Sequence, residues 1–521
     1  MNIATSQNIR EIDLYAEERL GIRARALMGR AGEAVADAVR ELSSGGNVII
    51  LAGKGNNGGD GYAAALSLSK THAVTVYDVF GSGQRSEAGK YYLDGCVEQG
   101  VKIVSGELPV TLIDSASVIV DAVFGTGYSG SLSDKLQYIA DTVNASEAAV
   151  VAVDIPLGID ADSGELSGSP VRAHITVALT LPKPAHLLYP AREYMGRVKV
   201  CSLGLDGLIG DSGAKDANSK ADTSKGGIPF KFSYHCIDKS IAAKFLPKRA
   251  ATSNKGSFGK TLHLTGSEKY RGAAHLALEA SLRTGVGLVG YLGAVSDELR
   301  LRFPEAIYEN LQAKSDTVSQ ICEISRKYTT TLIGSGSGVS EELYNTVKAL
   351  LATRGGALII DADGINSLAA YGSAHDLKGS SRPVLLTPHP LELSRLTGLE
   401  VGYINSHRLN IARQFAAEYG IILLLKGAGT VITDGNRAYI NTTGSTALSK
   451  GGSGDVLSGV IASLAAQTED TLTAAALAAY LHGAAGDSLS KTLSDFGVTP
   501  SDLPIEIAKQ INGLVRHLNH S

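Results

Sequence analysis

The chain has 521 residues, of which 44% are hydrophobic and 19% charged, and its formal net charge is −4. This length exceeds what one hydrophobic core fills and predicts two or three domains. The charge balance supplies no basic face for nucleic acid, and no stretch reaches the roughly 20 apolar residues of a membrane span. The N-terminus is charged throughout and has no apolar region typical of a secretion signal. The four cysteines lie far apart, which argues against a zinc site or disulfide framework. We expect a cytoplasmic protein.

The first half of the chain predicts a helical opening segment, residues 8–42, followed by alternating strands and helices up to about residue 203. The predicted strands are NVIILAG, HAVTVYDVF, ASVIVDAVFG, AAVVAVDIP, HITVALTLP and VKVCSLGL. Strands that alternate with helices indicate βαβ units and a mostly parallel sheet covered on both faces.

Composition changes between residues 205 and 233, where Gly, Ser, Asp and Lys replace large apolar residues. This is typical of a linker. A second alternating series begins near residue 261, includes a predicted hairpin (TVITDG and RAYINTTG), and ends in an Ala-rich helical tail from residue 456. We therefore expect an α/β protein with a domain at 1–212, a linker at 213–229 and a domain at 230–521.

The densest motif of the first half is GKGNNGGDGYAAA, residues 53–65, directly after the strand VIILA. Glycines at a strand-to-helix turn expose backbone N–H groups, and the helix N-terminus favours phosphate. Gly53, Gly55 and Gly58 satisfy G-x-G-x-x-G, and Asp78 follows at the end of the next strand, where a Rossmann acid would bind a ribose hydroxyl. Packed into the same turn are further polar side chains, Asn56, Asn57 and Asp60.

Two more predicted strands end in carboxylates, Asp121 and Asp154. The carboxyl ends of parallel strands share one edge, where ligands bind. Asp60, Asp121 and Asp154 are therefore expected to converge on one crevice.

In this order, GKGNNGGDG, DAVFGTGYSG, VDIPLGID and TLPKP resemble the NAD(P)H-hydrate epimerase domain, a Rossmann-like αβα sandwich. The resemblance covers about residues 9–205 and implies that Asp154 is catalytic. The chemistry of epimerisation needs a carboxylate, and Lys183 is the residue expected to assist it. It implies potassium ligands at Asn57, Asp121 and position 157. The family usually has Ser at that last position, so the Leu157 of this chain would offer only a backbone carbonyl. The implied contacts to the hydrated dinucleotide are Asn56, Asn57, Gly58, Gly59, Asp60, Gly125, Thr126, Gly127, Tyr128, Ser129, Gly130, Ser131 and Asp154.

In the second half, KGGSGDVLSG places a glycine-rich turn at a helix start with Asp455 at its mouth. Backbone donors of such a turn stabilise charge on a transferred phosphoryl group, and Asp455 is placed to accept a hydroxyl proton. The arrangement looks like the anion hole and base of ribokinase-like kinases. Lys426 precedes another glycine-rich turn, and His389 stands between two prolines.

Taken together, KGSFGKTLHLTGS, IGSGSG, DADGIN, TPHPLE, KGAGT and GGSGD resemble the NAD(P)H-hydrate dehydratase family from about residue 238 onward. The implied substrate contacts are Ala274, Gly336, His389 and the catalytic Asp455. The implied ADP or ATP contacts are Lys426, Gly427, Ala428, Gly429, Thr430 and Gly454.

The resemblance implies a repair enzyme for hydrated NADH and NADPH. It would epimerise the R and S hydrates, phosphorylate the ring hydroxyl of the S form with ADP or ATP and magnesium, and release phosphate. We expect small-molecule substrates, no nucleic acid, no membrane partner and a homo-oligomer. Three alternatives stay open: a vitamin or sugar kinase, a ligand-sensing protein and an NAD-dependent dehydrogenase.

Overall fold

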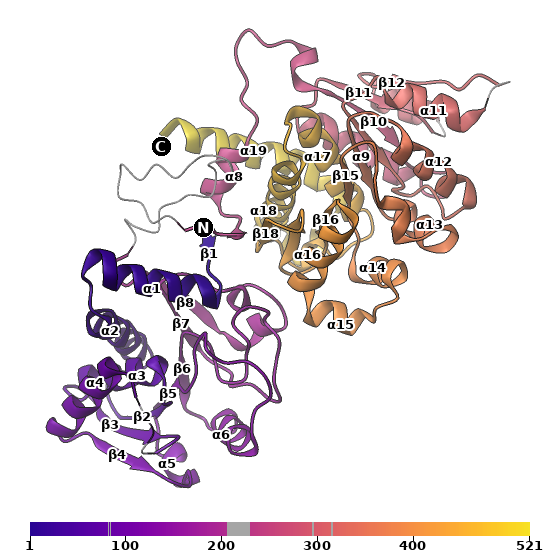
Figure 1. Ribbon diagram of the computed structural model, residues 1–521. Coiled ribbons are helices and arrows are strands. Elements are labelled where there is room, and N and C mark those ends of the chain that lie inside the picture. The colour runs from indigo at the N-terminus through magenta and orange to yellow at the C-terminus, as the bar shows by residue number, and fades with distance from the viewer. Residues whose placement is uncertain (82, 84, 206–229, 294–295, 314–315, 521) are drawn as a thin grey trace. The chain divides into compact units, whose positions relative to one another are not determined.

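The computed structural model describes residues 1–520 except 82, 84, 206–229, 294–295 and 314–315. Two compact units are present, residues 2–234 and 235–521, and Figure 1 colours them along the chain. The linker expected at 213–229 lies outside the described residues.

The first unit alternates strands and helices in the expected manner. Its strands are β1 (Asn2–Ile3), β2 (Asn47–Ala52), β3 (Ala73–Asp78), β4 (Lys102–Ser105), β5 (Val118–Ala122), β6 (Ala149–Val153), β7 (Ile175–Leu179) and β8 (Arg197–Cys201). Its helices are α1 (Ser6–Leu20), α2 (Ala24–Leu42), α3 (Asn56–Leu68), α4 (Glu87–Glu98), α5 (Val110–Asp114) and α6 (Asp134–Asn144), with short 3₁₀ turns η1 (Pro184–His186) and η2 (Ala191–Tyr194).

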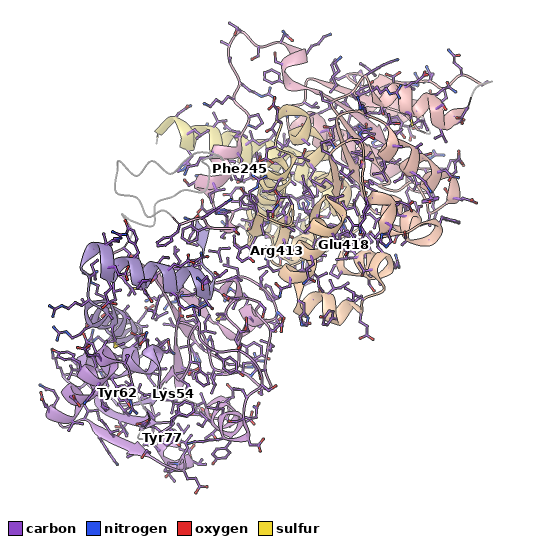
Figure 2. The ribbon with its side chains drawn as sticks, viewed as in Figure 1. Lys54, Tyr62, Tyr77, Phe245, Arg413 and Glu418 are labelled. Carbon is purple, nitrogen blue, oxygen red and sulfur yellow. The ribbon has the colours of Figure 1, made fainter. Side chains whose placement is uncertain are left out.

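A parallel sheet in the order β4-β3-β2-β5-β6-β7-β8 forms the centre of this unit. Successive residues of each strand face opposite sides, so both faces must be covered. Tyr62 belongs to the apolar cluster that joins the sheet to α2 and α3, and Tyr77 to the cluster under α5 and α6 (Figure 2). The unit is the αβα sandwich expected from the sequence.

The second unit has the same alternation and a longer helical tail. Its strands are β9 (Tyr234–Cys236), β10 (Lys260–Leu264), β11 (Leu288–Tyr291), β12 (Ile307–Tyr308), β13 (Thr330–Ile333), β14 (Ala357–Ile360), β15 (Val384–Leu386), β16 (Ile422–Leu425), β17 (Thr430–Thr433) and β18 (Ala438–Asn441). Its helices are α8 (Lys239–Phe245), α9 (Arg271–Arg283), α10 (Asp297–Arg302), α11 (Thr317–Ser325), α12 (Glu341–Ala352), α13 (Asp363–Tyr371), α14 (Pro390–Thr397), α15 (Val401–Ser406), α16 (Arg408–Tyr419), α17 (Ser453–Gln467), α18 (Thr471–Gly497) and α19 (Leu503–His520). Its 3₁₀ turns are η4 (Lys255–Phe258), η5 (Ala374–Leu377), η6 (Thr446–Leu448) and η7 (Pro500–Asp502).

The sheet of the second unit runs β9-β18-β17-β16-β15-β14-β13-β10-β11-β12. Its strands from β16 to β12 are parallel, and β17 and β18 form the predicted antiparallel hairpin. One large apolar cluster joins the central strands to α9, α17, α18 and α19. The Ala-rich composition of the tail allows these helices to pack closely.

Two details differ from the sequence prediction. The helical segment expected at 8–42 is two helices, because Gly21 adopts a left-handed conformation (φ 66°) and ends α1. Four short strands were not predicted. The four residues of β4 are half-buried or exposed and lack a strong apolar pattern, and β1, β9 and β12 have only two or three residues each. Among the described residues, no helix is long and apolar enough to cross a membrane.

Candidate active sites

In the first unit, the predicted substrate residues lie after the carboxyl ends of strands. Asn56 to Asp60 form the first turn of α3, directly after β2. Gly125 to Ser131 form the loop between β5 and α6, and Asp154 directly follows β6. These are the positions at which ligands bind an open α/β sheet.

Asp154 is held by three contacts from the end of β7 and the segment that follows it. Its Oδ1 accepts hydrogen bonds from Lys183 Nζ (2.5 Å) and the Leu179 amide (3.1 Å). Its backbone carbonyl accepts from His186 Nε2 (2.7 Å), and the other ring nitrogen of His186 accepts from the Lys183 amide (2.8 Å). Asp154 itself has a left-handed backbone (φ 64°), a conformation that Asp tolerates better than most residues and that often marks functional sites.

His186 is neutral in this arrangement. Burial and the nearby Lys183 charge lower the pKa of His186 to about 4. The ring therefore serves as a neutral donor to the Asp154 carbonyl, and Lys183 provides the positive charge that the buried carboxylate of Asp154 requires.

The second oxygen of Asp154 faces the predicted substrate loops. A Cβ placed on Gly125 would lie 3.2 Å from Asp154 Oδ2 and 3.0 Å from Asn57 Oδ1. Residues from three separate strand ends therefore meet at one point. Asp60 belongs to the same group, because burial and then the charge of Asp154 raise the pKa of Asp60 well above its ordinary value.

Two backbone amides orient the Asp121 carboxylate at the end of β5. Its carboxylate accepts hydrogen bonds from the amides of Val123 (3.2 Å) and Leu157 (2.7 Å), and burial raises its pKa to about 6. The Leu157 side chain is fully buried in the apolar cluster under α6, and its carbonyl accepts from the Val171 amide. The sequence predicted a potassium ligand at position 157. The Leu157 side chain has no oxygen atom, and its backbone carbonyl already accepts a hydrogen bond.

The remaining oxygen donors nevertheless suit a hard monovalent cation. Asp121 is a fully buried carboxylate without a cationic partner among the described residues, and Asn57 supplies an amide oxygen. Across the described part of the chain, no group of three or more His, Cys, Asp and Glu side chains is arranged to hold a metal ion.

Asp78 occupies the position of a Rossmann acid but has a structural role here. Its carboxylate pairs with Arg85 and accepts hydrogen bonds from the Phe80 and Gly81 amides. Arg85 in turn donates to the carbonyls of Gly81 and Gly83. The Asp78 carboxylate therefore stabilises the loop after β3.

In the second unit, the predicted residues again follow strand ends. Ala274 lies in the first turns of α9, Gly336 follows β13, and His389 caps α14 after β15. The run Lys426 to Thr430 joins β16 to β17, and Gly454 and Asp455 lie in the first turn of α17.

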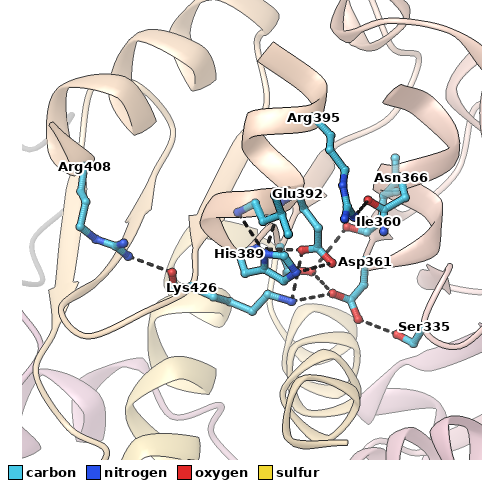
Figure 3. A network of polar contacts seen from close by, with 11 residues as sticks. Ser335, Ile360, Asp361, Asn366, His389, Glu392, Arg395, Arg408 and Lys426 are labelled. Carbon is cyan, nitrogen blue, oxygen red and sulfur yellow. Dashed lines mark hydrogen bonds and ion pairs between the residues drawn. The ribbon is translucent and has the colours of Figure 1, made fainter. Parts of the chain in front are cut away.

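Lys426 is the centre of a charged network at this edge (Figure 3). Its Nζ lies 3.1 Å from Asp361 Oδ1 and 3.8 Å from Glu392 Oε2. The Asp361 carboxylate also accepts hydrogen bonds from the hydroxyls of Thr387 and Ser335, each at 2.7 Å. Burial opposes ionisation of Asp361, but Lys426 and these donors hold its pKa below the ordinary value.

The Lys426 ammonium also reaches the predicted anion-binding turn. A Cβ on Gly454 would lie 3.7 Å from Lys426 Nζ. Burial raises the pKa of the adjacent Asp455 to about 7, and the charges of Asp361 and Asp363 add to this effect while Lys426 opposes it. A carboxylate with a pKa near neutrality is suited to general-base catalysis.

His389 serves first as a helix cap. Its Nδ1 accepts the amides of Leu391 (3.1 Å) and Glu392 (3.2 Å), and its own amide donates to Glu392 Oε2. Burial, then Lys426 and Arg395, lower the pKa of His389. Since Nδ1 is an acceptor, Nε2 carries the proton of the neutral ring, and it lies 3.4 Å from Glu392 Oε1.

Gly336 is required by close packing. Its φ is 64°, and a Cβ there would lie 2.5 Å from the Ala273 side chain. The side chain of the neighbouring Ala274 is almost fully buried, so its contact with a substrate would be through the backbone of α9.

Sequence reasoning missed three charged or polar residues of these sites. His186 was hidden in the segment LPKPAH, and Glu392 in the cap of α14, where it reads as an ordinary N-terminal helix residue. Asp13 lies on α1 among other exposed acids, and only the fold shows that its carboxyl interacts with Asp154 and Lys183.

Comparison with known proteins accounts for both units. The family model described as YjeF-related protein N-terminus matches residues 24–185, and that of NAD(P)H-hydrate dehydratase matches residues 262–509. The bifunctional NAD(P)H-hydrate repair enzyme of Thermofilum pendens is 32% identical, with 99% of this chain and 97% of the relative covered. The enzyme of the same name from Escherichia coli is 30% identical, with 99% and 95% covered.

Among solved structures, the ADP/ATP-dependent NAD(P)H-hydrate dehydratase of Bacillus subtilis, co-crystallised with ATP and Mg²⁺, is 28% identical. It matches with a TM-score of 0.48 and covers 54% of this chain and 98% of its own. Identity over almost the full length with the bifunctional relatives, together with the two domain matches, shows that this chain belongs to the family of bifunctional NAD(P)H-hydrate repair enzymes.

Proposed function

We propose that the second unit dehydrates the S hydrate of NADH or NADPH in the cytoplasm, using ADP or ATP, with Asp455 as the general base. The observation that carries this proposal is the position of Asp455 in the first turn of α17, beside Lys426 and with a pKa raised to about 7. A base of this kind is half ionised near neutral pH and keeps a strong affinity for a proton.

Asp455 removes the proton of the ring hydroxyl as that oxygen bonds to the terminal phosphorus of the nucleotide. The bond from this phosphorus to the leaving nucleotide breaks, and the amides of the GGSGD turn stabilise the charge on the transferred group. The carbon–oxygen bond then breaks, phosphate leaves with the electron pair, and loss of a ring proton restores the reduced nicotinamide. Phosphate is a far better leaving group than hydroxide.

Lys426 faces the reacting phosphoryl group in this proposal. Asp361 and Glu392 fix its ammonium within reach of Gly454. The glycine-rich run Gly427 to Thr430, which follows Lys426, contacts the rest of the nucleotide through its backbone. Substrate contacts come from Ala274, Gly336 and His389 Nε2. Magnesium usually enters with nucleotide phosphates and would neutralise their charge.

In the first unit, we propose that the turn Asn56 to Asp60 and the loop Gly125 to Ser131 bind the hydrated dinucleotide, with Asp154 at the reacting ring. Support comes from the free Oδ2 of Asp154, which faces Gly125 and Asn57. Potassium would be held by Asn57 and Asp121, where it would neutralise a buried carboxylate and order the loops, and Leu157 would add no side-chain ligand.

Incubation of the purified chain with separated R and S hydrates, Mg²⁺ and either nucleotide tests both assignments. Recovery of reduced-nicotinamide absorbance with stoichiometric free phosphate is expected from S hydrate. A stable phosphorylated product without recovered absorbance would instead indicate a small-molecule kinase. Recovery from R hydrate faster than its spontaneous epimerisation reports the first unit.

A further inference from the structure

Helix α1 of the first unit is fastened to the proposed epimerase site at its start. The Ser6 hydroxyl donates to the Thr126 carbonyl (2.8 Å), which lies in the substrate loop. The Ala4 amide donates to the Pro182 carbonyl (2.9 Å), directly before Lys183. The beginning of α1 is therefore tied to both the loop after β5 and the segment that carries the buried lysine.

The packing of α1 continues this contact along the helix. Ile12 and Ala16 belong to one apolar cluster with Leu181, so the helix lies along the residues after β7. Asp13 follows Ile12 and is seven residues, about two turns, beyond Ser6, which places the two on one side of the helix. The Asp13 carboxyl interacts electrostatically with Lys183 and Asp154, and it also acts on Asp60 of α3.

Two polar groups of the same site are buried without partners. Asp60 is 7% exposed, and within the described residues its carboxyl has neither a hydrogen bond nor an ion pair, only the nearby charges of Asp154, Asp13 and Lys183. Asn57 is 8% exposed, and its Nδ2 is likewise without a hydrogen-bond partner among them. Buried polar groups are nearly always satisfied, so these two indicate where a polar ligand completes the site.

We propose that Asp13 is a catalytic carboxylate of the epimerase site, which accepts the proton of the ring hydroxyl while Asp60 supplies a proton to the ring nitrogen. This inference rests on the epimerase function proposed above. It assigns the two proton transfers to Asp13 and Asp60, while Asp154, whose Oδ1 pairs with Lys183, directs its Oδ2 toward the substrate loops.

The step balances without a further reactant. Asp13 takes the hydroxyl proton, the released electron pair forms a carbonyl, and the carbon–nitrogen bond breaks with its pair moving to the ring nitrogen. That nitrogen takes the proton of Asp60. The carbonyl turns its other face to the nitrogen, the bond re-forms, Asp60 recovers its proton and Asp13 returns the first one to oxygen. The product differs only in configuration.

The charges around the site agree with these roles. The groups that face Asp13 are Asp60 from α3, Asp154 from the end of β6 and Lys183 from the segment after β7. Lys183 pairs with Asp154, so Asp60 and Asp13 share no cation of their own. Burial raises the pKa of Asp60 well above its ordinary value, and burial raises that of Asp13 to about 6 although its side chain keeps an exposed surface. Burial therefore favours the protonated form of Asp60, whereas Asp13 is mostly ionised at neutral pH and can exchange a proton.

The test uses the full chain without nucleotide, so that only exchange between R and S hydrates is followed by chromatography. Asp13→Asn should slow this exchange by roughly 10²–10⁴-fold, the usual effect of losing an acid–base group. The wild-type rate should fall as the pH drops through about 6, and the variant should lose this pH dependence. Glu18→Gln, which removes an exposed carboxylate on another side of the same helix, should leave the rate and the pH profile unchanged.

Asp13→Ser provides a second variant without a carboxylate if the asparagine variant is poorly folded by its thermal melt. A folded variant with the wild-type rate would overturn the role of Asp13, and so would a slow variant whose rate still falls below about pH 6. Either result would leave the epimerase function standing. If the wild type itself fails to exchange the hydrates faster than buffer does, the epimerase function is wrong as well.

Discussion

Substitution of Asp455 by Asn is the most direct test of the dehydratase site. The change keeps the size of the side chain and removes its capacity to accept a proton. The rate of S-hydrate dehydration should fall by roughly 10²–10⁴-fold, the usual contribution of a general base. Nucleotide binding should persist, because Lys426 and the backbone of the GGSGD turn remain, and epimerisation by the other unit should be unaffected.

The structure also gives the pH dependence of the wild type. Since Asp455 has a pKa of about 7 and acts in its ionised form, the rate should rise about tenfold between about pH 6 and pH 8, as the ionised fraction does. Asp361 raises the pKa of Asp455 through its charge. Asp361→Asn should therefore move the rise to lower pH, because it removes a negative neighbour and leaves Lys426 nearby.

The assay is a stopped measurement of reduced-nicotinamide absorbance from pure S hydrate with Mg²⁺ and saturating ADP or ATP. Equal nucleotide affinity of wild type and variant, measured by calorimetry, shows that binding is intact. The reasoning is refuted if Asp455→Asn dehydrates S hydrate within a few fold of wild type, or if it loses both activities while still folded. A shift of the Asp361→Asn profile to higher pH would contradict the charge argument.

Three further predictions concern stability and ions. Lys183→Met leaves a buried carboxylate unpaired and should lower the unfolding free energy of the first unit by about 3–5 kcal/mol, measured by urea denaturation; a loss below 1 kcal/mol, about the worth of an exposed pair, would show that the pair is dispensable. Potassium should stimulate epimerisation only weakly in the wild type. Leu157→Ser, at a fully buried apolar position, should lower the free energy of unfolding by about 2–5 kcal/mol. A gain in potassium affinity would identify the missing ligand, and an unchanged stability would contradict the packing. Residues 1–234 should melt cooperatively as a separate fragment, whereas 1–212 should be less stable because it lacks Phe232, which is buried in the first unit; equal melting temperatures would refute this.

The sheets and the positions of the sites could be predicted from the sequence because the signals are local. An apolar run followed by a glycine-rich turn marks a parallel strand and the start of the next helix, and the structure has Asp154 and Lys426 directly after strands and Asp455 in the first turn of a helix, as expected. The antiparallel hairpin β17–β18 was found for the same reason.

Contacts that depend on packing between distant segments could not be predicted. Asp78 fits a ribose-binding pattern by spacing, yet it pairs with Arg85, whose approach depends on the loop after β3. The amides of Val123 and Leu157 orient the Asp121 carboxylate, a contact that depends on how the loops after β5 and β6 pack. The contribution of Asp13 required knowing which side of α1 faces the sheet edge.

The contacts of Asp154, Lys183 and His186 form a closed loop, in which each residue holds the next. Loss of the Lys183 or the Asp154 side chain leaves the other buried charge without its partner. Loss of the His186 ring leaves the Lys183 amide and the Asp154 carbonyl without theirs. A single substitution at any of these three positions is therefore destabilising until the other positions change as well. In related chains we expect these three positions to vary together or to stay fixed, so that covariation at them would report a rebuilt site rather than drift.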